Sequence, residues 1–171
     1  MKMNPLLKLV LSAMFAALTC VATMAIQIPS PMNGYVNMGD CVVLMSGWIL
    51  GPIYGSLAAA IGSCFADIFS GYVIYAPATF IIKGLVALLA WLICNVMQKS
   101  RVHTLISRIC GGIVGEIAMV GGYFLYAAFV FGEGLAAAAS IPGNVMQGIF
   151  GIVIGILLTE VVVKIIKKAD R

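Results

Sequence analysis

The sequence predicts an all-α integral membrane protein, one domain of six transmembrane helices over residues 1–171. The first observation is composition: the chain is 63% hydrophobic and 9% charged, with a mean hydropathy of +1.12. An ordinary soluble domain carries roughly 25% charged residues, so this chain has too few charges to cover a surface in water. The second observation is a series of long apolar segments, because a helix needs about 20 residues to cross the ~30 Å hydrocarbon layer.

Six apolar segments alternate with short breaks of turn and polar residues. They cover residues 6–26, 39–50, 53–69, 77–97, 105–131 and 142–166. The second segment is short, so it and the third are alternatively interpreted as one bent hairpin or as a partly re-entrant piece. The first segment follows Lys2 and Lys8 in the manner of a signal peptide. We interpret it as a span, since it is long enough and no soluble domain follows it.

The basic residues predict the orientation. Nine of the ten form three clusters, before segment one, between segments four and five, and at the C-terminus: Lys2, Lys8, Lys99, Arg101, Arg108, Lys164, Lys167, Lys168 and Arg171. Six crossings place all three clusters on one side, which the positive-inside rule makes cytoplasmic. We therefore expect a multi-pass protein of the bacterial plasma membrane, with both termini on the cytoplasmic side.

Charged residues within the spans are the strongest pointers to function. Lys83 in segment four and Asp67 in segment three are each eight residues from Tyr75, near the turn that joins them. A rise of 1.5 Å per residue puts both roughly 8 to 12 Å below the outer boundary, where an antiparallel hairpin brings them together. Two interpretations stay open: a neutralising ion pair, or a polar floor under an outward-facing pocket. Ser63 and Ser70 extend the polar face of Asp67.

Polar and aromatic residues continue this candidate site into the last two segments. Glu116 shares a helical face with Tyr123, and it is interpreted either as a protonated side chain between helices or as a ligand acceptor or proton site. Tyr126 favours an interfacial aromatic belt. Asn144 and Gln147 share one face and are expected to face the bundle interior, because amides are costly in lipid. They are interpreted as pocket residues, with interhelical hydrogen bonding as the alternative.

Several function classes lack their signatures. The five cysteines form no C-x-x-C pair and His103 is the single histidine, so we expect no metal site and no cofactor. The sequence contains neither a G-x-x-x-x-G-K-[ST] phosphate loop nor a G-x-S-x-G motif. We therefore expect no catalytic residue, no ATPase and no enzyme, and any energy must come from a partner. The net charge of +4 is no sign of nucleic-acid binding, because the basic residues flank membrane spans.

Small residues at four-residue spacing mark close helix contacts. Gly47, Gly51 and Gly55 follow this spacing, and so do Ala13 and Ala17 in segment one. Packing within the chain is the first interpretation. For segment one, a partner protein is the alternative. Near the C-terminal end, Glu160 is expected to pair with Lys164 four residues later.

Four stretches carry a resemblance to a known family. They are residues 34–44 (GYVNMGDCVVL), 50–55 (LGPIYG), 62–72 (GSCFADIFSGY) and 75–84 (YAPATFIIKG). The chain resembles the substrate-binding S component of energy-coupling factor (ECF) vitamin transporters, in the branch of riboflavin, pyridoxine and hydroxymethylpyrimidine uptake. The length, the six spans and the basic C-terminus agree with this family over the whole chain.

The resemblance implies a division of labour. An S component binds a vitamin or precursor near the outer face, in a pocket capped here by a loop with Pro29, Pro31, Asn33 and Tyr35. It associates with a transmembrane coupling protein and two cytoplasmic ATPases, and Ala13 and Ala17 resemble the surface that docks on the coupling protein. The whole subunit would topple in the membrane to carry its ligand inward.

The residues expected to bind the ligand come from the polar pattern within the spans and from the family resemblance. They are Asn37, Asp40, Asp67, Tyr75, Lys83, Glu116, Tyr123, Asn144 and Gln147. Tyrosines and neutral polar groups suit a heteroaromatic alcohol, so pyridoxine or hydroxymethylpyrimidine is favoured and riboflavin comes next. The alternative is a self-sufficient channel or proton-coupled carrier, in which Glu116 would be functional.

Overall fold

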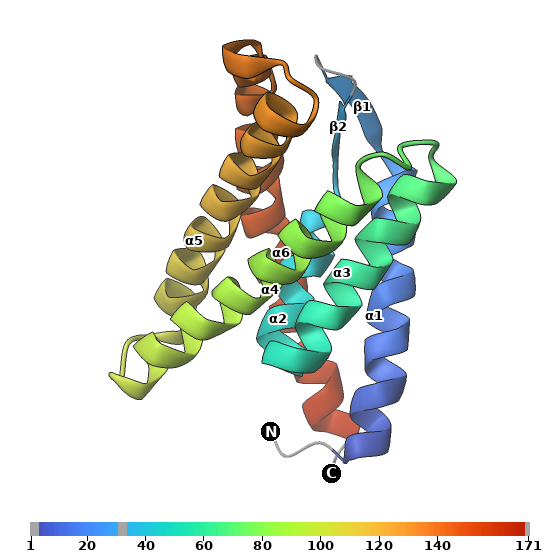
Figure 1. Ribbon diagram of the computed structural model, residues 1–171. Helices are drawn as coiled ribbons and strands as arrows, with labels where there is room; N and C mark the ends of the chain where they lie inside the picture. The colour runs from blue at the N-terminus through green and yellow to red at the C-terminus, as the bar shows by residue number, and fades with distance from the viewer. Residues whose placement is uncertain (1–3, 31–33, 170–171) are drawn as a thin grey trace.

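The computed structural model describes residues 4–30 and 34–169. It is a bundle of helices with a small β-hairpin at one end, and both termini lie at the opposite end (Figure 1). The elements in chain order are α1 (Pro5–Ala25), β1 (Gln27–Ser30), β2 (Gly34–Asn37), α2 (Asp40–Leu50), α3 (Pro52–Phe69), α4 (Ala76–Lys99), α5 (Thr104–Leu125), a π-helical turn η1 (Tyr126–Val130), a 3₁₀ helix η2 (Gly134–Ser140) and α6 (Ile141–Ala169).

The helix bounds follow the predicted segments closely, because turn and capping residues delimit them. Pro52 and Pro77 stand in the first turns of α3 and α4, where the missing N–H costs nothing. Gly51 joins α2 to α3 with φ +88°, a conformation that glycine adopts without strain. Asn4 caps α1 by accepting from the Leu6 N–H.

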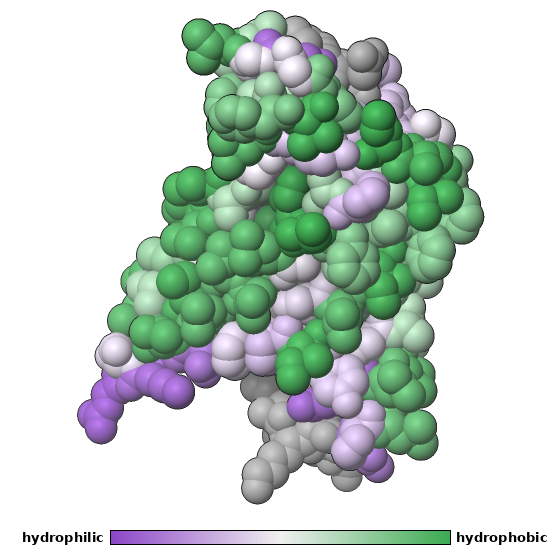
Figure 2. Space-filling view, viewed as in Figure 1, coloured by the Kyte–Doolittle hydropathy of each residue, from purple (hydrophilic) through white to green (hydrophobic). Residues whose placement is uncertain are grey.

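Five helical runs are long and apolar enough to cross a membrane: α1, α3, α4, α5 with η1, and η2 with α6. Their outward faces carry large apolar side chains, and in Figure 2 hydrophobic residues cover most of the middle of the molecule. Because a soluble fold would bury such faces, the structure agrees with an all-α, multi-pass membrane protein.

The second predicted span, residues 39–50, differs from the other five. α2 has 11 residues, about 16 Å of helix, which is half of the hydrocarbon thickness. It lies in the centre of the bundle, packed against α1, α3, α4 and α6, and its first eight residues are all buried. The hairpin strand β2 precedes it, so strand and helix together form this part of the chain.

The hairpin departs from the all-α expectation. β1 and β2 pair antiparallel, with Gln27 opposite Asn37 and Pro29 opposite Tyr35. Of the loop residues expected to cap a pocket, Pro29 is exposed on β1 and Tyr35 lies on β2. Pro31 and Asn33 fall outside the described residues.

Glycines allow the closest helix approaches. A Cβ added at Gly47 on α2 would overlap the carbonyl oxygen of Ala87 on α4, and one at Gly55 would overlap that of Ser46. Gly111 on α5 meets the carbonyl of Ala90 in the same way. The glycine spacing in these helices therefore serves packing within the chain.

Candidate functional site

A cavity opens at the hairpin end of the bundle, with an empty volume of about 610 Å³ including its solvent-filled mouth. β2, α1, α3, α4, α5 and α6 all contribute to its wall. The lining residues are Thr23, Tyr35, Asn37, Ser63, Asp67, Tyr72, Tyr75, Thr79, Lys83, Tyr123, Ala127, Ser140, Asn144 and Gln147. Ligand pockets typically combine apolar walls with a few convergent polar groups, and the lining of this cavity has that composition.

The floor of the cavity is a buried polar network. Lys83 on α4 forms an ion pair with Asp40 at the start of α2. The other oxygen of Asp40 accepts from the Gln147 amide at 2.6 Å, and the Gln147 oxygen accepts from the Asn37 backbone N–H at 2.7 Å. Four elements are thereby joined, and the two charges of this network, Lys83 and Asp40, neutralise each other, as low-dielectric surroundings require.

This network corrects the predicted partnership of Lys83. Among the described residues its ion pair is with Asp40 and not with Asp67. Asp67 lies two residues before the end of α3, about 3 Å of rise, whereas Lys83 lies seven residues into α4, about 10 Å. The sequence estimate applied the helical rise to all eight residues between Asp67 and Tyr75, although residues 70–75 form the turn between the two helices, so it placed Asp67 too deep.

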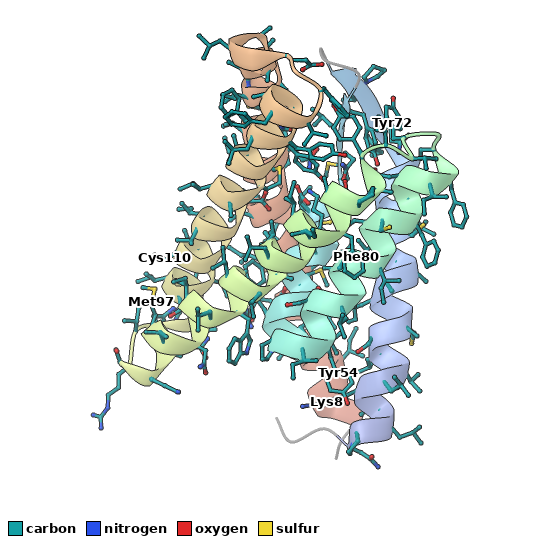
Figure 3. All side chains as sticks on the ribbon, in the orientation of Figure 1. Lys8, Tyr54, Tyr72, Phe80, Met97 and Cys110 are labelled. Atoms are coloured by element: carbon teal, nitrogen blue, oxygen red, sulfur yellow. The ribbon has the colours of Figure 1, made fainter. Side chains whose placement is uncertain are left out.

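The hairpin is held over the cavity by side chains of α3. The Tyr35 hydroxyl donates to Asp67 at 2.5 Å, and Gln27 donates to Ser70 at 2.8 Å. The Tyr35 and Tyr72 rings lie 4.6 Å apart, and Tyr72 stands at this end of the molecule in Figure 3. Burial first, and then the Asp67 carboxylate, raises the pKa of Tyr35, so this phenol stays a neutral donor.

Aromatic rings form the wall on the α4 and α5 side. Tyr75 lies 6.5 Å from Tyr123 and 4.9 Å from Phe131, measured between ring centroids. The Tyr123 hydroxyl is 3.0 Å from the Thr79 hydroxyl, and the Lys83 ammonium lies 5.5 Å from the Tyr123 ring centroid. Burial, followed by the Glu133 carboxylate, raises the pKa of Tyr75 to about 12. These rings present uncharged faces on which a ligand ring can stack.

Several polar groups of the lining have no hydrogen-bond partner within the described residues, and three of them are candidates for contact with a ligand. Asp67 Oδ2 and Ser63 Oγ are buried without one. The Asn144 side chain is 8% exposed, lines the cavity, and its amide likewise makes no bond to a described residue. Buried polar groups are normally satisfied, so these three are available to a ligand.

Of the nine residues predicted to bind the ligand, seven line the cavity. The two exceptions are Asp40 and Glu116. Asp40 lies behind the wall, fully buried, and orients Lys83 and Gln147. Glu116 lies deeper, against Gly148 and Gly151 of α6, and neither of its oxygens has a partner among the described residues.

Sequence reasoning left several lining residues out, among them Thr79, Thr23 and Tyr72. Thr79 stands four residues before Lys83, so helical spacing alone would have found it. Thr23 lies four residues after Thr19 on the same buried face of α1, and this spacing of two hydroxyls was not used. Tyr72 was not predicted as a site residue, because its contact with Tyr35 depends on the hairpin.

Two further predictions concern other parts of the chain. Ala13 and Ala17 are exposed on α1, as a docking stripe requires. Glu160 pairs with Arg108 of α5, and the expected pairing with Lys164 is wrong because α5 packs against α6 at this level. Within the described residues, no group of three or more His, Cys, Asp or Glu side chains is arranged to hold a metal ion.

Comparison with known proteins shows the family to which the chain belongs. The family model described as "ECF-type riboflavin transporter, S component" matches residues 3–164. An uncharacterized protein of Pyrococcus woesei is 33% identical over 137 residues, 79% of this chain and 87% of that protein. A solved structure of the S component of a bacterial ECF transporter has the same fold, with a TM-score of 0.76 at 22% identity, over 96% of this chain and 99% of that one.

The family match covers nearly the whole chain, and the structural match shares its architecture. The helical membrane fold agrees with both. The chain therefore belongs to the family of ECF transporter S components, the substrate-binding subunits of these transporters.

Proposed function

We propose that the protein captures a small, neutral heteroaromatic vitamin or vitamin precursor at the outer face of the membrane. The observation that carries this proposal is the set of three unpartnered polar groups, Asn144, Ser63 and Asp67 Oδ2, in a cavity walled by tyrosines. A ligand with two or three polar substituents on one aromatic ring would satisfy these groups and stack on the rings.

The charges of the site favour a neutral ligand. Asp40, itself buried, neutralises Lys83, so among the described lining residues an anionic group would meet no cation without a buried opposite charge. Asp67 keeps one oxygen free to accept from a hydroxyl or ring N–H. Pyridoxine or hydroxymethylpyrimidine fits this chemistry best. Riboflavin is the second candidate, because the family's description names it.

For delivery we propose six crossings with both termini inside, followed by toppling of the whole subunit. Lys8, Lys99 and Arg101 lie at the end of the bundle that holds the termini (Figure 3 shows Lys8 beside Tyr54), in agreement with the positive-inside rule. Leu44 and Met119 are fully buried in the bundle, and Met119 lies about one turn of α5 deeper than the cavity residue Tyr123. A packed core of this kind supports movement of the subunit as one body over passage through it.

The proposed partners are a transmembrane coupling protein and two cytoplasmic ATPases. The chain contains no phosphate-binding loop of its own. The exposed Ala13 and Ala17 would leave a shallow stripe on α1 for close approach of a partner helix.

Ligand titration of the purified chain in detergent tests this function. Pyridoxine, hydroxymethylpyrimidine, thiamine and riboflavin would be titrated by calorimetry, without partner proteins or ATP. We expect tight one-to-one binding of a single-ring compound. Binding of riboflavin alone would make it the substrate, and a folded protein that binds none of the four would remove the proposed substrate class.

A proton-coupled carrier is the second candidate, favoured by the buried and unpartnered Glu116 carboxylate. The two mechanisms differ in what drives uptake. In proteoliposomes that contain the chain alone, we expect no ligand uptake under a proton gradient. Gradient-driven uptake that Glu116→Gln abolishes would establish the carrier instead.

A further inference from the structure

A second cavity lies at the opposite end of the bundle, where both termini are found (Figure 1). Its walls come from the last turns of α2 and α4, the start of α5 and the C-terminal part of α6, and its empty volume is about 920 Å³ including the space open to the surroundings. None of its described lining residues also lines the cavity at the hairpin end, so the two cavities are separate.

The polar groups of this second cavity include several hydrogen-bond donors. Arg108, Asn95 and Gln98 line it together with Thr104. The buried indole N–H of Trp48 has no acceptor among the described residues, and the Asn95 amide bonds to none of them. No Asp or Glu stands among the lining residues, so the cavity suits a ligand rich in acceptors.

Arg108 keeps donors free for such a ligand. One terminal nitrogen of its guanidinium is paired with Glu160, whose side chain is 51% exposed. A guanidinium has five N–H groups, so most of them remain available. Arginine in this situation binds phosphate through parallel, charge-assisted hydrogen bonds.

The remaining lining is formed by the two tryptophans with Ile49, Cys94 and Val163. In Figure 2 paler and purple residues gather around the α4–α5 turn and across the lower part of the same face. The site thus combines polar groups with an apolar wall, and it lies between membrane helices near a basic turn. These features suit an amphipathic lipid. Basic pockets between transmembrane helices bind anionic lipid headgroups.

We propose that this cavity binds the phosphate headgroup of an anionic phospholipid, with its upper acyl chain against the indole rings. Arg108 and the two amides donate to the phosphate and glycerol oxygens. The site is independent of vitamin capture, because its residues take no part in the outer cavity.

The tryptophans provide a direct test. The chain contains two, Trp48 and Trp91, and both line this cavity. The full chain in detergent micelles would be titrated with phosphatidylglycerol or phosphatidylcholine, each carrying a dibrominated acyl chain that quenches indole fluorescence on contact. We expect half-maximal quenching at an about fivefold lower mole fraction of phosphatidylglycerol.

Two arginines give a matched pair of variants. Arg108→Gln should reduce the preference for phosphatidylglycerol to less than about twofold, whereas Arg101→Gln, an exposed residue of the adjacent turn outside the lining, should retain it. If both variants lost the preference for phosphatidylglycerol equally, the preference would come from general attraction to a basic surface, and the proposed site would be refuted. Equal quenching by the two lipids in the original chain would also overturn the proposal.

Two further measurements keep the test decisive. If Arg108→Gln does not fold, as judged by circular dichroism, the double variant Asn95→Leu with Gln98→Leu retains the ion pair and should lose the same preference. Millimolar inorganic phosphate should leave the quenching unchanged. Displacement of the brominated lipid by free phosphate would show a site for small anions and overturn the lipid assignment.

Discussion

Asn144→Leu separates ligand binding from helix packing at the outer cavity. The Asn144 side chain is 8% exposed on α6, lines the cavity, and bonds to no described residue through its amide. Leucine has a similar size and no polar group, so the substitution removes the hydrogen-bonding capacity and little else.

The expected loss of affinity follows from the amide's two ends. One donor and one acceptor to a neutral ligand contribute about 0.5–1.5 kcal/mol each, or about 1–3 kcal/mol together. Since 1.4 kcal/mol is a factor of ten, the dissociation constant should rise about 5- to 150-fold. Gln147→Leu is a poorer test, because Gln147 also holds Asn37 and Asp40 in the ligand-free protein.

The ligand-free protein, in contrast, should not lose stability when Asn144 is replaced by leucine. An unsatisfied buried amide costs free energy that a leucine does not. We therefore expect the unfolding transition of Asn144→Leu without ligand to match or exceed that of the original chain. An amide that joins helices would give a clear loss of stability instead.

Calorimetric titration and thermal unfolding in the same detergent would measure both quantities. Asn95→Leu is the matched control, the same substitution at an amide that lines the second cavity and not the first. It should leave vitamin affinity unchanged. Unchanged affinity in Asn144→Leu, or a loss of stability of about 1 kcal/mol or more, would refute its assignment to ligand binding.

Three further substitutions test the network, the packing and the docking stripe. Lys83→Met should cost about 3–5 kcal/mol of unfolding free energy, because Asp40 is left buried and unpaired. Adding Asp40→Asn should restore most of this loss in chemical unfolding, and a double variant as unstable as the single one would contradict the ion-pair argument. Gly47→Ala should destabilise by about 1–3 kcal/mol through overlap with α4, whereas Gly121→Ala, which meets nothing within 4 Å, should be neutral or slightly stabilising in the same unfolding assay. Ala17→Leu should lower ATP-driven uptake with the coupling module while calorimetry shows unchanged vitamin affinity, and unchanged uptake would remove this position from the docking stripe.

The positions of the long helices could be predicted from the sequence because local signals define them. Proline in the first turns of α3 and α4, and glycine with positive φ between α2 and α3, delimit segments whose apolar length already indicates a span. Most of the lining could also be predicted, since a charge or amide within an apolar segment must face the interior. Such reasoning identifies a face of a helix without identifying its partner.

The partners could not be predicted because they depend on contacts between distant parts of the chain. Tyr35 and Asp67 are 32 residues apart, and Asn37 and Gln147 are 110 apart. The hairpin that carries Tyr35 and Asn37 is held by such contacts as well as by its own short strands. Arg108 and Glu160 likewise pair across 52 residues, which overrides the local pairing of Glu160 with Lys164.

The short α2 explains why Asp40 is the partner of Lys83. A full-length helix in this position would begin at the outer boundary and carry its first residues to the level of the mouth. The outer half of this part of the chain is instead strand β2, and α2 begins where β2 ends. Asp40, in the first turn of α2, therefore lies at the depth of Lys83, about two turns into α4. The hairpin thus has two roles, since it walls the cavity with Tyr35 and Asn37 and sets the depth at which the buried carboxylate meets the lysine.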